Sequence, residues 1–126
     1  MKFLSSWEGN AYFLLRIVFG FLYTCHGLQK LFLPGLLHGE KVPAGFNIFF
    51  IGAVIELVAG VLIFFGFFTR CAAFVASGEM AVAYFKVHAP HGFFPIVNHG
   101  ELAVIYCFVA LYIACRGAGR LGIDKS

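Results

Sequence analysis

Residues 49–68 form an apolar run of twenty residues with one charged side chain, Glu56, near its middle. A run of this length is typical of a helix that crosses a bilayer, because the hydrocarbon core requires about 20 apolar residues. An unpaired carboxylate at that depth costs roughly 3 kcal/mol on insertion scales, so such residues usually face a bundle interior and often mark function. The chain places a second carboxylate, Glu79, in another apolar run. We therefore expect both carboxylates to face neighbouring helices.

The remaining sequence has the same membrane character. The chain is 61% hydrophobic and 12% charged, with a mean hydropathy of +0.90, which indicates an integral membrane protein. Short connections make sequential helices antiparallel, so we predict an all-α, up-down-up-down four-helix bundle that forms one domain over residues 1–126. The predicted spans are residues 11–32, 46–68, 71–88 and 100–116.

The basic residues predict how the bundle is oriented, because cytoplasmic loops carry an excess of lysine and arginine. With both termini in the cytoplasm, five basic residues lie on that side and three on the other. The five are Lys2, Arg70, Arg116, Arg120 and Lys125, and the three are Lys30, Lys41 and Lys86. We predict cytoplasmic termini, and the formal net charge of +3 favours anionic lipid headgroups over a nucleic-acid partner.

Local signals predict the ends of the helices. Two Ser/Asn-x-x-Glu patterns are typical of capping boxes at the starts of the first and last spans. Thr69 is a candidate cap for the third span. The capping pairs are Ser5 with Glu8 and Asn98 with Glu101, and the predicted outer loops are residues 34–43 and 89–101.

A polar stripe runs along the first span. Arg16, Tyr23 and Lys30 recur every seven residues and therefore lie near one line of a helix. Gly20 and Gly27 lie between them. His26 and Gln29 flank the line. A polar stripe with glycine gaps faces a partner helix rather than lipid.

Both glutamates lie on faces made of small residues. Gly52 and Gly60 stand four residues before and after Glu56, and alanines surround Glu79 at helical spacing. We expect Gly20, Gly27, Gly52 and Gly60 to be helix-packing residues. We also expect Arg16 to pair directly with a glutamate, and Tyr23, His26, Gln29 or trapped water to link the outer side.

These buried charges have two interpretations. They form a polar site for a ligand, a proton or a quinone, or they only fix helix register. The ligand or polar-site candidates are Arg16, Tyr23, His26, Gln29, Lys30, Glu56 and Glu79.

The second outer loop holds further candidates, which are His88, His91, Asn98, His99 and Glu101. Histidine and glutamate are possible metal ligands, but nothing in the spacing demands a metal, and we predict none. No Cys-x-x-Cys-His motif is present, so we expect no covalently bound cofactor. The GFFP segment (92–95) is a candidate lining for a flat apolar ligand such as a quinone.

Taken together, these elements resemble the DoxX family of small bacterial and archaeal membrane proteins. The resemblance covers nearly the whole chain through RIVFGFLYTCHGLQKLF, GAVIELVAGVLIFFGFFTRCAAF, GEMAVAYF and NHGELAVIYCFVALY. The family signature residues on matching positions are Arg16, His26, Gly27, Lys30, Glu56, Gly60, Asn98 and Glu101. Here His99 interrupts the usual Asn-Gly-Glu form. The resemblance implies a multi-pass protein of the bacterial or archaeal cytoplasmic membrane, associated with quinone- or thiol-linked redox complexes.

Three functions are open on the sequence. The first is an accessory subunit of an inner-membrane redox complex, in which His26, Gln29 or Lys30 would bind a quinone carbonyl and Glu56 or Glu79 would relay a proton. The second is a small proton-coupled or solute transporter or channel that acts as a homo-oligomer. The third is a packing subunit among other membrane subunits. An autonomous enzyme is disfavoured because no nucleophile, metal set or cofactor motif is complete.

Overall fold

The computed structural model describes residues 1–31 and 48–124, and the predicted loop 34–43 therefore lies outside the described residues. A short helix, α1 (Lys2–Ser6), precedes the long helix α2 (Glu8–Leu31), and the chain turns between them at Trp7. The other long helices are α3 (Ile48–Phe65), α4 (Thr69–Ala83) and α6 (Glu101–Arg116). Between α4 and α6 lie a π-helical turn η1 (Tyr84–His88), a 3-10 turn η2 (Ala89–His91) and the short helix α5 (Pro95–Asn98). The described elements are all helical, which confirms the all-α prediction.

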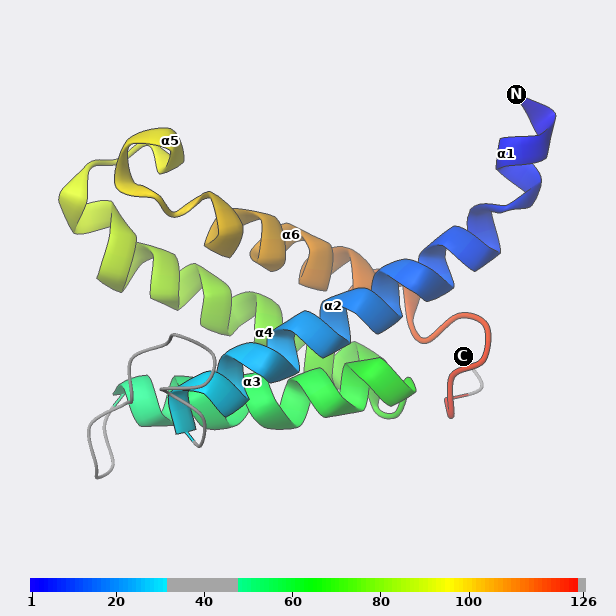
Figure 1. Ribbon diagram of the computed structural model, residues 1–126, viewed down its shortest axis with the longest axis horizontal. Coiled ribbons are helices and arrows are strands. Elements are labelled where there is room, and N and C mark those ends of the chain that lie inside the picture. The colour runs from blue at the N-terminus through cyan, green and yellow to red at the C-terminus, as the bar shows by residue number, and fades with distance from the viewer. Residues whose placement is uncertain (32–47, 125–126) are drawn as a thin grey trace.

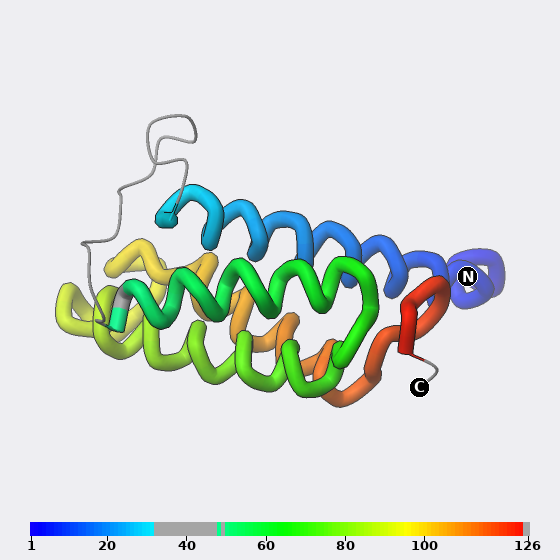
Figure 2. The backbone as a smooth tube through the Cα atoms, turned by 90° about the horizontal axis from the view of Figure 1, so that it is seen from below, coloured from blue at the N-terminus to red at the C-terminus, as the bar shows by residue number. Residues whose placement is uncertain are grey.

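The four long helices run alternately up and down, with α2 beside α3 and α4 beside α6 (Figures 1 and 2). Both chain termini lie at the same end as the turn between α3 and α4, and we call this the terminal end. The opposite end holds η1, η2 and α5, and we call it the far end. Within the described residues the arrangement matches the predicted helical bundle.

The lengths of the helices bear on the predicted spans. By length and composition, α2 is the one helix in the described part of the chain that is suited to cross a membrane. The apolar segment Phe50–Phe65 of α3 is shorter. α4 has 15 residues and α6 has 16, and η1 continues α4 to His88. A topology with four spans therefore stays a prediction.

The contact between α2 and α3 is close because glycines lie in it. A Cβ atom at Gly20 or Gly27 would lie 2.5 or 2.6 Å from a backbone nitrogen of α3, and one at Gly60 would lie 2.6 Å from a backbone nitrogen of α2. Real side chains do not tolerate such distances to backbone. Gly52 differs from the other three. A Cβ atom added there would lie 3.6 Å from a carboxylate oxygen of Glu79, which is an ordinary van der Waals distance.

The start of α4 is capped by the C-terminal tail, by which we mean residues 117–124, after the end of α6. The Asp124 carboxylate accepts hydrogen bonds from the backbone nitrogens of Phe68 at 3.0 Å and Thr69 at 2.8 Å. The Asp124 backbone nitrogen in turn donates to the Gly66 carbonyl at 2.8 Å. Thr69 was the predicted cap, and this prediction is wrong, because Thr69 is already the first residue of α4 and its hydroxyl is buried.

Both predicted capping boxes are also wrong. Ser5 lies inside α1 and its hydroxyl donates to the Met1 carbonyl, while α2 begins at Glu8. At α6 the N-cap residue is Gly100, and Asn98 instead belongs to the preceding helix α5. In each case the N-cap residue lies two residues after the one that the local pattern indicates.

Gly27→Ala should separate α2 from α3 and lower the free energy of unfolding by about 1–3 kcal/mol, because the new methyl group meets backbone rather than a flexible side chain. Gly78→Ala is the matched control, since a Cβ there meets nothing within 4 Å. The control should be neutral or stabilising by about 1 kcal/mol through helix propensity. Thermal unfolding of both variants in detergent measures the difference. Equal effects would contradict the close α2–α3 contact.

Asp124→Ala should remove the cap of α4 and lower the free energy of unfolding at neutral pH by about 1 kcal/mol. Backbone hydrogen bonds from Thr69 and Phe68 hold the pKa of the Asp124 carboxyl below its usual value. The contribution is therefore fully present above the pKa of the unfolded chain and is lost as pH falls through the folded-state pKa. Unfolding curves of wild type and variant should converge in acid. A deficit that persists at the lowest pH would show that the carboxylate is not the cap.

Candidate functional site

Lys30 and Glu56 form an ion pair between α2 and α3. Lys30 Nζ lies 2.9 Å from each carboxylate oxygen of Glu56. The Glu56 side chain is 1% exposed, whereas that of Lys30, near the C-terminal end of α2, is 36% exposed. Glu56 thus meets the basic stripe of the first span, as the spacing predicts, and one member of the pair reaches the surface.

Glu79 on α4 adds a second carboxyl to this pair. Tyr23 Oη donates to Glu79 Oε1 at 2.8 Å. The Glu79 carboxyl also interacts with Glu56 and with Lys30. We call Tyr23, Lys30, Glu56 and Glu79 the polar network. It joins three helices that are distant in sequence.

Aromatic rings cover the network on the side of α6. Phe19 stacks on Tyr23 with ring centroids 5.4 Å apart, and Tyr106 of α6 meets Tyr23 edge-on at 6.0 Å. Tyr106 was not among the predicted site residues, because an aromatic residue in an apolar run gives no signal that separates it from ordinary core. Tyr23 is fully buried against these rings, whereas Glu79 is partly exposed.

His26 lies beside the network and bonds within its own helix. His26 Nδ1 donates to the Leu22 carbonyl of its own helix at 2.9 Å, and its ring meets Tyr106 edge-on. Gln29 is partly buried next to Lys30. Of the expected links, the Tyr23 hydroxyl bonds to Glu79, and Lys30 contacts Glu56 directly.

The composition of the network determines what it can do chemically. Two ionised carboxylates and one ammonium carry a net charge of −1, and a proton held between Glu56 and Glu79 makes the group neutral. Two neighbouring carboxylates repel each other when both are ionised, and a shared proton relieves that repulsion. The arrangement can therefore bind and release a proton.

Arg16 does not join this network, and the expected Arg16–glutamate pair is wrong. Its guanidinium lies at the terminal end, against Gly66 of the α3–α4 turn and Gly122 of the tail. Arg16 is fully buried, and Nε, Nη1 and Nη2 have no hydrogen-bond partner in the described part of the chain. Its neighbours include the Phe13 ring, 5.4 Å from Cζ.

Asn98 organises the far end. Its amide nitrogen donates to the Gly92 carbonyl at 2.6 Å and to Tyr84 Oη at 3.1 Å, and its amide oxygen accepts from Gly100 N at 2.8 Å. The Tyr84 hydroxyl donates to the Phe93 carbonyl. Asn98 is 4% exposed, and its hydrogen bonds tie the loop to itself and to Tyr84 of η1, so its role here is structural.

The remaining far-end candidates do not converge. His91, His99 and Glu101 are exposed, and His88 Nδ1 lies 3.3 Å from the Asn98 carbonyl. Among residues 1–31 and 48–124, no group of three or more His, Cys, Asp or Glu side chains is placed to hold a metal ion.

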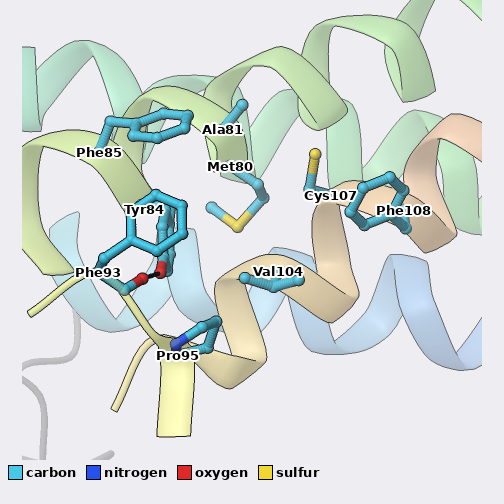
Figure 3. Close-up of a pocket in the computed structure, with 9 residues that line it drawn as sticks. All are labelled: Met80, Ala81, Tyr84, Phe85, Phe93, Pro95, Val104, Cys107 and Phe108. Atoms are coloured by element: carbon cyan, nitrogen blue, oxygen red, sulfur yellow. Dashed lines mark hydrogen bonds between the residues drawn. The ribbon is translucent and has the colours of Figure 1, made fainter. Parts of the chain in front are cut away.

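An apolar pocket of about 360 Å³ lies between α4, η1 and α6 near the far end (Figure 3). Phe93 and Pro95 of the GFFP segment form one wall, and Met80, Val104 and Phe108 lie around it. The Tyr84–Phe93 hydrogen bond holds the wall in place. The lining of the pocket is apolar.

Comparisons with known proteins give a consistent family. The family model named DoxX matches residues 11–89. A Haemophilus influenzae protein named only "Uncharacterized protein" is 44% identical over 120 residues, covering 90% of each chain. A Bacillus subtilis protein named "Putative oxidoreductase CatD" is 28% identical over 116 residues, covering 88% of this chain and 82% of the relative. No solved structure gives a significant match.

Asn98→Ala should lower the free energy of unfolding by about 2–3 kcal/mol, because it leaves the buried Gly100 N–H and the Gly92 carbonyl without partners. His91→Ala, an exposed position in the same loop, is the control and should change stability by less than about 0.5 kcal/mol. Thermal unfolding in detergent compares the two. A neutral Asn98→Ala variant would mean that the loop does not depend on these hydrogen bonds.

Proposed function

The chain belongs to the DoxX family, and on that premise we propose that it is an accessory subunit of a redox complex in the bacterial inner membrane. DoxX proteins are membrane proteins. The proposal assigns to the polar network the task of supplying protons to a quinone, while electrons come from a partner redox subunit. Reduction of a quinone to a quinol takes up two electrons and two protons.

The outer surface of the bundle supports a multi-pass arrangement. Each long helix presents large apolar side chains to its surroundings, and Phe21, Val58, Phe74 and Phe108 are all more than half exposed. A water-soluble monomer rarely carries such a surface on every side. The proposed orientation places the terminal end, with its basic residues, in the cytoplasm.

The observation that carries the redox proposal is the contact of the Glu56 and Glu79 carboxyls beside Lys30. Register alone would require a single ion pair, whereas this group has a surplus carboxyl that can hold a proton. Lys30 is partly exposed, and its ammonium is a hydrogen-bond donor that a quinone carbonyl could reach. The name of the Bacillus subtilis relative, an oxidoreductase by description, agrees with this direction.

The same carboxyl pair favours a second candidate, a proton-coupled transporter that acts as a homo-oligomer. A transporter would load and release the shared proton on opposite sides of the membrane. Liposomes that contain only this protein would then show proton-coupled flux, whereas an accessory redox subunit would show none without its partner.

A packing subunit is the third candidate. If the network only fixes register, joint replacement of Lys30 and Glu56 by methionine should retain both fold and function, since a buried pair can often be replaced by apolar residues. Replacing Lys30 alone would still destabilise the protein by leaving Glu56 buried without a cation.

Glu79→Gln should lower the rate of quinone reduction at least about ten-fold in the complex isolated from native membranes, because the amide keeps the Tyr23 hydrogen bond but holds no proton. Glu101→Gln, an exposed carboxyl at the start of α6, is the matched control. The complex is isolated in mild detergent, and its subunits, bound quinone and absorption spectrum are recorded. An unchanged rate in a folded Glu79→Gln complex would refute the role of the network, and isolation without partner, pigment or quinone would favour the transporter.

A further inference from the structure

The guanidinium of Arg16 is the least satisfied polar group in the described part of the chain. It is 0% exposed, and none of its three nitrogens donates a hydrogen bond to a described residue. A guanidinium has five N–H donors, and burying a charge without partners is strongly unfavourable. Lys30, the other interior cation, has a full carboxylate partner. Packing alone therefore gives no reason for an arginine at this position.

Two glycine backbones lie against the Arg16 guanidinium, and its Cζ lies 5.4 Å from the centroid of the Phe13 ring. A Cβ at Gly122 would lie 2.8 Å from Arg16 Nη1, and a Cβ at Gly66 would overlap the same atom. Gly66 lies in the turn that leads into α4, and Gly122 lies two residues before Asp124 in the tail. The guanidinium thus lies between the turn that precedes α4 and the part of the tail that carries the capping residue Asp124.

An anion already occupies the start of α4. The Asp124 carboxylate accepts from the backbone nitrogens of Phe68 and Thr69, and it interacts electrostatically with Arg16 without a hydrogen bond to it. Helix N-termini with a neighbouring arginine are preferred sites for phosphate groups. A carboxylate has two oxygens, and both are used on the helix. A phosphate group has further oxygens that the buried guanidinium can bind.

We propose that the terminal end is a phosphate-binding site built from the Arg16 guanidinium and the N-terminus of α4, and that the tail carboxylate of Asp124 occupies it in the absence of ligand. The phosphate belongs to an anionic phospholipid headgroup or is free in solution, and the recognition chemistry is the same for both. Binding displaces Asp124, so ligand and tail compete. The site lies at the opposite end from the glutamates and does not depend on the redox proposal.

The attachment of the tail allows this exchange. Its hydrogen bonds to the bundle include Ile123 N to the Phe65 carbonyl at 3.2 Å and Asp124 N to the Gly66 carbonyl at 2.8 Å. Leu121 is 83% exposed, so the tail buries little apolar surface at that residue. Ile123 is 61% exposed as well, whereas Gly117 and Ala118 are buried, so local opening that displaces Asp124 needs to involve only residues 121–124.

The test measures thermal unfolding of the full-length protein in detergent, with inorganic phosphate or with phosphatidylglycerol, at constant ionic strength. Asp124→Ala should gain about 4 °C or more in Tm from the phosphate compound, and wild type should gain less, because its own carboxylate competes. Adding Arg16→Met to Asp124→Ala should abolish the gain. Adding Arg120→Gln instead should retain it, since Arg120 is an exposed cation at the same end whose guanidinium donates to Asn10.

Comparing inorganic phosphate with phosphatidylglycerol shows whether the bound phosphate is free in solution or belongs to a lipid headgroup. A gain with both indicates a site open to free phosphate, and a gain with phosphatidylglycerol alone indicates a lipid headgroup site. No gain with either compound in Asp124→Ala, or a gain that survives Arg16→Met, would overturn the proposal. Since Arg16→Met removes an unpartnered buried charge, this variant is expected to fold.

A second measurement needs no substitution at Arg16. Trypsin cleaves after Arg120, which lies in the tail, and displacement of the tail should speed this cleavage at least about three-fold in wild type when the effective phosphate compound is present. The control solution contains chloride in place of the phosphate compound, has the same ionic strength and contains no sulfate. Cleavage that phosphate slows or leaves unchanged would mean that the tail is not displaced, and the proposed competition would be wrong.

Discussion

The polar network depends on the close approach of α2 to α3. Gly20, Gly27 and Gly60 have no side chains in that contact, so the two backbones meet directly. At this separation Lys30 Nζ lies 2.9 Å from both carboxylate oxygens of Glu56. A buried ion pair is favourable only when its geometry is good, because each charge has lost its water. Backbone packing and electrostatics therefore support each other in this bundle.

Much of this arrangement follows from spacing in the sequence. Apolar runs separated by Gly, Pro and polar residues predict the helices, and the structure places the ends of α3 and α6 within three residues of the predicted boundaries wherever both are described. The seven-residue spacing of Tyr23 and Lys30 puts both on the buried side of α2, and Glu56 meets that side as expected. These properties depend on the helical period, which any local segment carries.

The error over Arg16 has a physical cause. Cα–Cβ bonds in a helix tilt toward its N-terminus, so long side chains lie over the preceding turn. Lys30, near the end of α2, consequently extends back toward the middle of the bundle and meets Glu56. Arg16, near the start, extends toward the terminal end and away from both glutamates. Helical spacing gives the direction of a side chain around the axis, but the direction along the axis decides which partner it meets.

Local sequence patterns also could not predict contacts between segments that are distant in the sequence. Asp124 caps α4 from 55 residues away in the sequence, and no motif near Thr69 indicates this. The Asn98 contacts are short in sequence but require Gly92 and Tyr84 to be brought together by the π-helical turn η1. A π-helical turn has no reliable sequence signature, although such turns are frequent at functional sites.

The residues of the polar network differ in how far they are exposed. Tyr23 and Glu56 are buried under Phe19 and neighbouring helices, while Lys30 is partly exposed. A change in the proton content of the glutamate pair alters the charge that Lys30 faces, and it thereby alters how strongly Lys30 is held inside. An anionic or carbonyl ligand at the far end would compete with Glu56 for the same ammonium. Under either proposed function, proton binding by the glutamates and ligand binding by Lys30 would be coupled through this one ion pair.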